Sequence, residues 1–207
     1  MISPKFPDRL ASGRPQKFVY FGTSLTEGGT WNRRLTAALD EKFPGLVLSV
    51  NTAKGGETSV WGLANFQERV LAHRPDVLFM EFTINDAVAR FNISLAESAR
   101  NLTTMLDSLH EALPHCEVIL QIMNPVIDRP EGHTGHRGNL PAYCDQWRAI
   151  AGERGLTLID HWPQWSHLLE TNEQEFRQLV PDGLHPEDEG YRIIVMPELL
   201  RACRLVD

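Results

Sequence analysis

The sequence contains little cysteine, with three residues in a chain of 207: Cys116, Cys144 and Cys203. They are widely separated, odd in number and lack the short spacing of metal-binding motifs. A disulfide framework and a cysteine-based metal site are therefore not expected. The simplest interpretation is that all three are reduced thiols.

Long hydrophobic runs are also missing. The first 14 residues contain prolines and charges but no apolar core of the length that a secretory signal needs. No later apolar run is long enough to cross a bilayer. These features predict a cytoplasmic protein without a membrane partner, whereas a signal removed from a longer precursor would make the protein a secreted one.

Positive charge is in deficit, because 20 Lys and Arg residues face 27 Asp and Glu residues, giving a formal net charge of −7. Such a chain has no long-range attraction for polyanions, so nucleic acids and anionic membrane surfaces are not expected partners. Internal repeats, low-complexity segments and interdomain linkers are absent too. We therefore expect one domain over residues 1–207, with residues 1–16 as an N-terminal extension. The oligomeric state is left open.

Apolar runs alternate with helical patterns along the chain. The apolar runs predict strands at residues 17–21, 46–50, 77–82, 118–122 and 157–159. Apolar residues at helical spacing predict helices at residues 31–43, 60–72, 95–113, 140–154 and 186–205. This alternation indicates an α/β fold, a three-layer α/β/α sandwich around a doubly wound, parallel, five-stranded sheet.

Ligands of such sheets bind beyond the carboxyl ends of the strands. This rule directs attention to four loops, at residues 22–29, 51–59, 83–87 and 124–139. The fourth loop is long and rich in Pro, Gly and His. Loops of that length are often lids or binding loops.

The first of these loops, in "YFGTSLTEGG", places Ser24 directly after a predicted strand. A serine there is either a turn former, a helix cap or a nucleophile. A nucleophilic serine needs a base and a third group that orients the base. In "PDGLHPEDEGY", Asp182 precedes His185 by three residues, close enough to bond its Nδ1–H, although His185 before Pro186 also fits a helix start.

A tetrahedral oxyanion needs hydrogen-bond donors that are fixed in advance. Gly56 in "NTAKGGETS" lets the backbone approach a substrate, and Asn85 in "EFTINDA" offers an amide at the end of a predicted strand. Taken singly, Gly56 is equally a turn glycine and Asn85 a turn or cap residue. Asp86 is interpreted as a cap or local acceptor. Glu81 lies inside a predicted buried strand, where a carboxylate needs a partner that the sequence does not identify.

The order of these motifs, with Ser, Gly, Asn and Asp-x-x-His at successive loops, resembles the SGNH (GDSL-type) hydrolase family. The resemblance spans residues 18–191 and is carried by "FGTSLT", "NTAKGGETS", "TINDA" and "DGLHPEDEGY". It implies a flavodoxin-like fold and no metal or organic cofactor. It also implies Ser24 as nucleophile, His185 as general base and then acid, and Asp182 as the carboxylate that orients His185.

The same resemblance implies an oxyanion hole made of the Ser24 and Gly56 N–H groups and the Asn85 side chain. Gly56 is preferred to Gly55 because "GGETS" resembles the Gly-acidic-Thr pattern of the family at the second glycine. Two residues depart from the family pattern. Thr23 replaces the usual Asp and Thr83 replaces a common Gly, which leaves the three catalytic roles intact but bears on substrate choice.

Several residues are candidates for substrate contact. Trp31 and Trp61 follow the Ser24 and Gly56 motifs, where their rings would either stack on a sugar or acyl group or pack in helices. His133 and His136 lie in the long loop and would contact substrate or remain solvated. Together with Asp128 and Glu131 they also allow a metal site, the less favoured alternative.

The prediction is a serine esterase that forms an acyl-enzyme, acting on small acyl groups such as acetyl on a carbohydrate or related polar substrate. A thioesterase, arylesterase or lysophospholipase of the same family is the alternative enzyme. A catalytically inactive protein that binds glycans or acyl groups is the alternative of another class.

Overall fold

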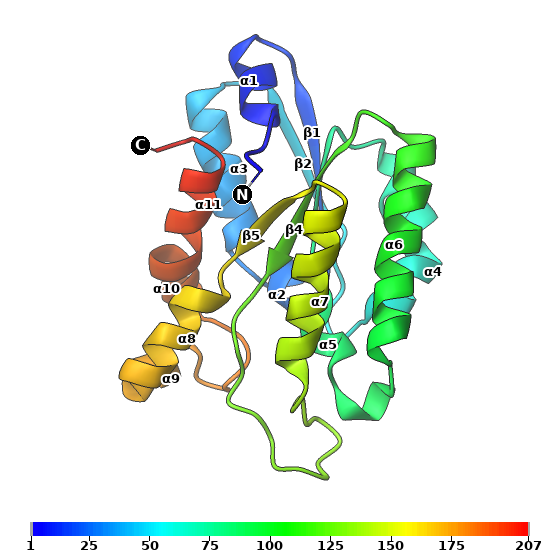
Figure 1. Cartoon of the computed structure of the whole chain (residues 1–207). Helices are drawn as coiled ribbons and strands as arrows, with labels where there is room; N and C mark the ends of the chain where they lie inside the picture. Colours follow the sequence, from blue (N-terminus) through cyan, green and yellow to red (C-terminus); the bar gives the residue numbers. More distant parts are fainter. Residues whose placement is uncertain (1, 207) are drawn as a thin grey trace.

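The computed structural model describes residues 2–206 and contains a single parallel sheet of five strands. The strands are β1 (Gln16–Phe21), β2 (Val47–Asn51), β3 (Val77–Met80), β4 (Glu117–Ile122) and β5 (Thr157–Asp160). Their order across the sheet is β2-β1-β3-β4-β5, and every neighbouring pair is parallel (Figure 1). This is the flavodoxin-like order of a doubly wound sheet, so the predicted fold class is confirmed.

Helices cover both faces of the sheet. Phe18 and Tyr20 point to one face and Phe21 to the other, as alternate residues of a strand must. Phe18 packs edge-on against Phe6 of α1 (Phe6–Ala11), and Tyr20 packs against Trp31 of α3 (Trp31–Lys42). On the other face, Phe21 contacts Phe66 of α4 (Ser59–Arg69). The buried strands therefore consist largely of apolar residues.

The two helical layers are clear in Figure 1. One layer contains α1, α3 and α11 (Met196–Ala202), with α3 and α11 in contact. The other contains α4 (Ser59–Arg69), α6 (Leu95–Ala112) and α7 (Leu140–Glu153), packed in that order. Two single-turn helices, α2 (Ser24–Glu27) and α5 (Thr83–Asp86), begin just beyond the carboxyl ends of β1 and β3.

Four predicted boundaries are wrong by two or three residues. The predicted helix at residues 60–72 ends at Arg69, and the one at residues 186–205 ends at Ala202. The third strand ends at Met80 and does not reach Phe82, whose backbone (φ −145°, ψ −7°) has already left the extended conformation to begin α5. The last helix begins at Asp188 because Glu187 is extended. It continues as α10 (Asp188–Gly190), a π-helical turn (Tyr191–Val195) and α11.

Besides the single-turn helices α2 and α5, which lie in predicted loops, three α-helices were not predicted from the sequence: α1, α8 (Trp162–Thr171) and α9 (Glu173–Leu179). They are only 6, 10 and 7 residues long, so each spans too few turns for a helical pattern to stand out in the sequence. Trp165 of α8 and Phe176 of α9 pack edge-on with ring centroids 5.7 Å apart, and both side chains are fully buried. Tertiary packing therefore supports these short helices.

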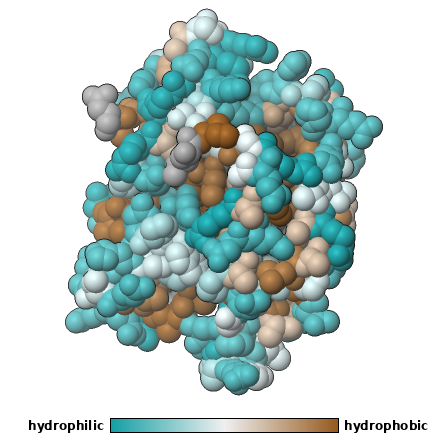
Figure 2. Space-filling view, in the orientation of Figure 1, coloured by the Kyte–Doolittle hydropathy of each residue, from teal (hydrophilic) through white to brown (hydrophobic). Residues whose placement is uncertain are grey.

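The surface shown in Figure 2 is mostly hydrophilic, with apolar residues in separate patches. Among residues 2–206, every helix falls short of the length and apolar character that a membrane span requires. Cys116, Cys144 and Cys203 are all free thiols.

Candidate active site

The turn after β1 brings Ser24 to the surface. Thr23 is the N-cap of α2, and its Oγ1 accepts a hydrogen bond from the Leu25 N–H at 3.3 Å. Gly22 has to be glycine, because a Cβ atom there would lie 2.7 Å from the Glu81 carbonyl oxygen. The Gly-Thr-Ser sequence therefore makes a tight connection from strand to helix. Ser24 itself is partly exposed.

Residues 161 positions apart meet at this turn. The hydroxyl of Ser24 lies 2.8 Å from Nε2 of His185, and Nδ1 of His185 lies 2.6 Å from Oδ2 of Asp182. Because Nδ1–H donates to the carboxylate, Nε2 is free to accept the hydroxyl proton of Ser24. The other Asp182 oxygen accepts the N–H groups of Leu184 and His185 at 2.8 and 2.7 Å.

These hydrogen bonds decide the charge of Asp182. Partial burial raises the pKa of this carboxyl group, but hydrogen bonds from the His185 side chain and from the His185 and Leu184 N–H groups outweigh the burial. The net effect holds the pKa of Asp182 below its ordinary value. An ionised carboxylate thus faces Nδ1–H. The side chains of His185 and Asp182 are 43% and 54% exposed, so this part of the site is open to solvent.

The loop that carries His185 is held by the segment after β4. Gly183 has a φ of +78°, and its carbonyl oxygen accepts the Ile127 N–H at 2.9 Å. The Leu184 carbonyl oxygen accepts a hydrogen bond from Nδ2 of Asn124, also at 2.9 Å. The beginning of the long loop at residues 124–139 therefore supports the loop with the His185 imidazole.

The predicted oxyanion donors lie on the two neighbouring loops. Gly55 donates its N–H to Oε2 of Glu27 at 2.9 Å, whereas the N–H groups of Gly56 and Ser24 donate to none of residues 2–206. Gly56 has a φ of +76°, which explains the glycine. Asn85 is buried, and its Nδ2 donates one hydrogen bond to the Glu57 carbonyl oxygen at 2.8 Å, which leaves its second N–H available.

Asp86 fastens the same two loops together. Its Oδ1 accepts the N–H of Ser59 at 2.7 Å, at the start of α4, and its Oδ2 accepts the hydroxyl of Ser98 in α6 at 2.6 Å. Asp86 is thus a buried acceptor at a helix N-terminus, as its position in the sequence indicates. Asn85 and Asp86 together tie the Glu57–Ser59 backbone to the end of β3.

The structure identifies the partner of Glu81. Its fully buried carboxylate accepts hydrogen bonds at Oε1 from the Thr23 N–H (2.7 Å), the Thr23 hydroxyl (2.9 Å) and the Thr26 hydroxyl (2.8 Å). Burial raises the pKa of Glu81 to about 7, although these hydrogen bonds oppose the shift. Glu81 therefore lies directly beneath the turn that carries Ser24.

The expectation that Trp31 contacts substrate is wrong. Its side chain is fully buried against Tyr20 and Phe79, and its Nε1–H donates to the Leu25 carbonyl oxygen at 3.0 Å. Trp31 is a core residue that supports α2 from below. Of the two alternatives that the sequence allows, packing in a helix is the correct one.

Trp61 is partly exposed but already has neighbours. Its ring packs on Phe21 at a centroid distance of 5.8 Å. Lys54 Nζ and Arg69 Cζ lie 5.7 and 5.6 Å from the ring centroid. A sugar would have to displace one of these cations to stack on the ring.

The two histidines of the long loop have local partners. Nδ1 of His133 accepts the Gly135 N–H at 2.9 Å, and Nδ1 of His136 lies 2.9 Å from Oδ2 of Asp128. Nowhere in residues 2–206 do three or more His, Cys, Asp or Glu side chains gather at metal-binding distance. The contacts explain how the loop is folded but assign His133 and His136 no role in chemistry.

Arg137 was not a candidate in the sequence, yet it reaches the site. Its Nε donates to the carbonyl oxygen of Ile84, the residue before Asn85, at 2.9 Å, and its Nη1 donates to the Gly135 carbonyl oxygen at 3.0 Å. Burial lowers the pKa of Arg137 from its ordinary value, and the Asp128 and Asp182 carboxylates oppose this shift. Contacts between residues so far apart in sequence leave no local pattern.

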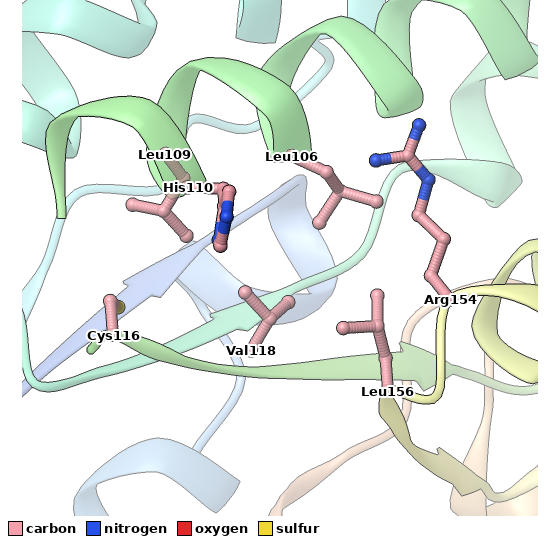
Figure 3. Close-up of a pocket in the computed structure, with 7 residues that line it drawn as sticks. All are labelled: Leu106, Leu109, His110, Cys116, Val118, Arg154 and Leu156. Carbon is pink, nitrogen blue, oxygen red and sulfur yellow. The ribbon is translucent and has the colours of Figure 1, made fainter. Parts of the chain in front are cut away.

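A hollow elsewhere on the molecule lacks an activated nucleophile of the kind that Ser24 and His185 could form. Figure 3 shows it beside the C-terminal half of α6 and the beginning of β4, where it is lined by Leu106, Leu109, His110, Cys116, Val118, Arg154 and Leu156. The side chain in this lining that could act as a nucleophile is the Cys116 thiol, and burial raises its pKa to about 12. The thiol stays protonated at neutral pH, so the hollow lacks an activated nucleophile.

Comparisons with known proteins identify the family of the chain and proteins of similar fold. Residues 20–193 match the model of the GDSL-like lipase/acylhydrolase family. The acetylxylan esterase Axe2 from Geobacillus stearothermophilus has a similar structure, with a TM-score of 0.76 at 20% identity over 92% of this chain and 94% of that chain. A protein described as a GDSL-like lipase from Parabacteroides merdae gives a TM-score of 0.80 at 16% identity over 93% and 97% of the two chains. No curated protein sequence matches the chain significantly.

Proposed function

We propose that Ser24, His185 and Asp182 are the catalytic residues of this chain, which belongs to the GDSL-like lipase/acylhydrolase family and is a carboxylic ester hydrolase. One observation carries this proposal: the continuous path from Ser24 Oγ to His185 Nε2 (2.8 Å) and from His185 Nδ1 to Asp182 Oδ2 (2.6 Å). This is the connectivity that turns a serine hydroxyl into a nucleophile. In Axe2, the published catalytic mutants replace a serine, an aspartate and a histidine three residues after the aspartate. Asp182 and His185 have the same spacing.

Hydrolysis proceeds in two steps. Ser24 Oγ attacks the ester carbonyl carbon while His185 Nε2 takes its proton, and the protonated imidazole then gives that proton to the departing alkoxide. A water molecule, deprotonated by His185, attacks the acyl-enzyme and releases the acid and the free serine. The ionised Asp182 holds Nδ1–H and stabilises the imidazolium that forms in each step.

The negative charge of each tetrahedral intermediate falls on the former carbonyl oxygen. The N–H groups of Ser24 and Gly56 and the second N–H of Asn85 Nδ2 are the donors proposed for it. Two observations support them. Neither backbone N–H donates to any of residues 2–206, and the Asn85 amide is already oriented by its bond to the Glu57 carbonyl oxygen. Fixed donors of this kind stabilise the transition state without reorganisation.

For the substrate we propose an ester of a small acyl group, acetyl first, on a carbohydrate or related polar alcohol. The open environment of His185 and Asp182 suits a large hydrated leaving group. The structural likeness to an acetylxylan esterase points the same way. A long acyl chain would instead require an extended apolar surface beside Ser24.

The test is hydrolysis of p-nitrophenyl esters from acetate to decanoate by wild type and Ser24→Ala, together with acetate release from acetylated xylo-oligosaccharides. We expect the wild type to prefer acetate and Ser24→Ala to be inactive but folded. A long-chain optimum would indicate a lipase or thioesterase. Equal inactivity of both folded proteins on every ester, with retained glycan binding, would support a binding protein and overturn the proposal.

A further inference from the structure

We propose that Glu81 is a positioning residue for the nucleophile, because its buried carboxylate fixes the turn that presents Ser24 Oγ and the free Ser24 N–H to the substrate. The inference rests on the proposed function of Ser24. It assigns a role to a residue that lies outside the Ser24–His185–Asp182 path and touches neither substrate nor reacting atoms.

The geometry places Glu81 at the centre of the turn. Its hydrogen bonds come from both sides of the nucleophile, from Thr23 immediately before Ser24 and from Thr26 two residues after it. Oε2 adds a longer bond from the Thr23 hydroxyl at 3.1 Å. Gly22 makes room for this arrangement, since a Cβ atom there would lie 2.8 Å from Cδ of Glu81. Gly22, Thr23 and Thr26 thus all lie against one carboxylate.

The direction of two consecutive N–H groups follows from this contact. The Thr23 N–H points inward to Oε1, and the next N–H in the chain, that of Ser24, has no partner in the described residues. Without the carboxylate, the Thr23 N–H would be a buried donor without an acceptor and the turn would relax. The Ser24 N–H and Oγ move with that turn. A displacement of about 1 Å at a reacting group costs about a hundredfold in rate.

Helix α2 is too short to hold this geometry alone. A single turn such as Ser24–Glu27 is unstable in isolation. The Thr26 hydroxyl donates to Glu81, and the Tyr191 hydroxyl donates to the Leu25 carbonyl oxygen at 3.2 Å. The nucleophile therefore lies on a short helix that the carboxylate holds in place.

Charge pairing does not account for Glu81. It is 1% exposed, and none of its hydrogen-bond partners is a cation. No described Lys, Arg or His forms an ion pair with it. Burying a carboxylate in this way is costly, and the nearby Asp86 carboxylate adds to the cost. Local rules are broken in this manner mostly at functional sites, where geometry matters more than stability.

The experiment compares Glu81→Gln with Glu117→Gln. Glu117 is a largely buried carboxylate at the amino end of β4, the opposite end of the strands from Ser24, where it pairs with Arg9 at 2.9 Å. For each variant we would measure kcat and KM for p-nitrophenyl acetate, the rate of labelling by a serine-directed phosphonate, and the melting temperature. Phosphonate labelling reports on Ser24 and the oxyanion donors together, without requiring the natural substrate.

Glu81→Gln keeps one acceptor oxygen but puts an NH2 donor in place of the other, opposite the donor hydroxyl of Thr23. We therefore expect it to lower kcat and the labelling rate by roughly tenfold, with little change in KM. Glu117→Gln should lose stability but keep both rates. Thr26→Val, which removes one of the hydrogen bonds and leaves the carboxylate, should lower kcat by a smaller factor and keep the fold. It is the decisive variant if Glu81→Gln does not fold.

The outcomes separate this inference from the proposed function. If wild type is labelled at Ser24 and both Glu81→Gln and Thr26→Val react at the wild-type rate, Glu81 is not a positioning residue, although the proposed function stands. If folded wild type is neither labelled nor active on any ester, the proposed function and this inference fail together. A loss of rate in the control Glu117→Gln equal to that in Glu81→Gln would also overturn the inference.

Discussion

The side-chain amide of Asn85 donates a hydrogen bond to the Glu57 carbonyl oxygen at 2.8 Å, which joins the loop after β3 to the loop after β2. Gly56, with its free N–H, immediately precedes Glu57 in the chain. One hydrogen bond therefore fixes the distance between two of the three proposed oxyanion donors. Each donor is held in place before a substrate arrives, as electrostatic stabilisation of a transition state requires.

Asn85→Ala should lower kcat by about a hundredfold to a thousandfold, the usual effect of removing one oxyanion donor. The matched control is Asn65→Ala. Asn65 also donates its side-chain amide to a backbone carbonyl oxygen, that of Trp61 at 2.9 Å. It lies in α4, one turn after Trp61, and is outside the site. Hydrolysis of p-nitrophenyl acetate by the two folded variants decides the matter. Equal rates would remove Asn85 from the oxyanion hole.

The elements that the sequence predicts well are those with a strong local pattern. The strand beginning at Gln16 is a run of apolar residues that ends in a Gly-Thr-Ser turn, so its position and the exposure of Ser24 follow from neighbouring residues alone. The Asp182–His185 spacing is equally local. For these features, local reasoning and the family resemblance give the same answer.

The features that the sequence does not predict depend on contacts across the fold. For Trp31 the sequence leaves substrate contact and helix packing as alternatives, and the packing of α3 on the sheet, with the ring buried, decides between them. Glu81 has its partners 55 and 58 residues away, at Thr26 and Thr23. Asn124 reaches the Leu184 carbonyl oxygen across 60 residues. No periodicity or local motif encodes such pairs.

Glu81 should also produce a defined pH dependence of stability. Its pKa rises from an ordinary 4.5 to about 7 in the folded protein, because the carboxyl group is buried. Between these two values the native protein holds a proton that the unfolded chain has released. The contribution of Glu81 to the free energy of unfolding therefore falls as the pH rises through this range, and the penalty is complete above pH 7.

The measurement is the difference in unfolding free energy between wild type and Glu81→Gln, from urea titrations at a series of pH values. A shift of this size corresponds to roughly 3 kcal/mol. Wild type should lose stability relative to the variant as the pH rises from 4.5 to about 7. A difference that is constant across this range would mean that Glu81 titrates normally in the folded protein.

Arg137→Met should reduce activity moderately. The substitution keeps a long apolar stem but removes the guanidinium that bonds the Ile84 carbonyl oxygen, next to Asn85. A hydrogen bond of this kind contributes ~1 kcal/mol. If its loss displaces Asn85 and the whole of this free energy is lost from transition-state stabilisation, kcat falls by about fivefold. The control is Arg129→Met in the same loop, where the side chain is exposed. Equal kcat values for the two variants would show that the Ile84 contact does not influence the site.

Gly183→Ala tests how the loop with His185 is held. Gly183 has a φ of +78°, and an added Cβ atom would lie 3.0 Å from the Cβ of Ile127 and 3.2 Å from its carbonyl oxygen. The matched control is Gly13→Ala, at a φ of +80° with open space around the added atom. Both substitutions force alanine into the left-handed region, at a cost of about 1–2 kcal/mol.

Only Gly183→Ala should also lose activity. Its methyl group would collide with Ile127, so the loop must shift and carry Asp182 and His185 away from Ser24. We expect kcat to fall by about tenfold or more while Gly13→Ala keeps the wild-type value. Melting temperatures and kcat of both variants separate the two effects. If Gly183→Ala loses stability but hydrolyses p-nitrophenyl acetate like Gly13→Ala, the His185 loop tolerates displacement, and the contact between residues 127 and 183 serves the fold alone.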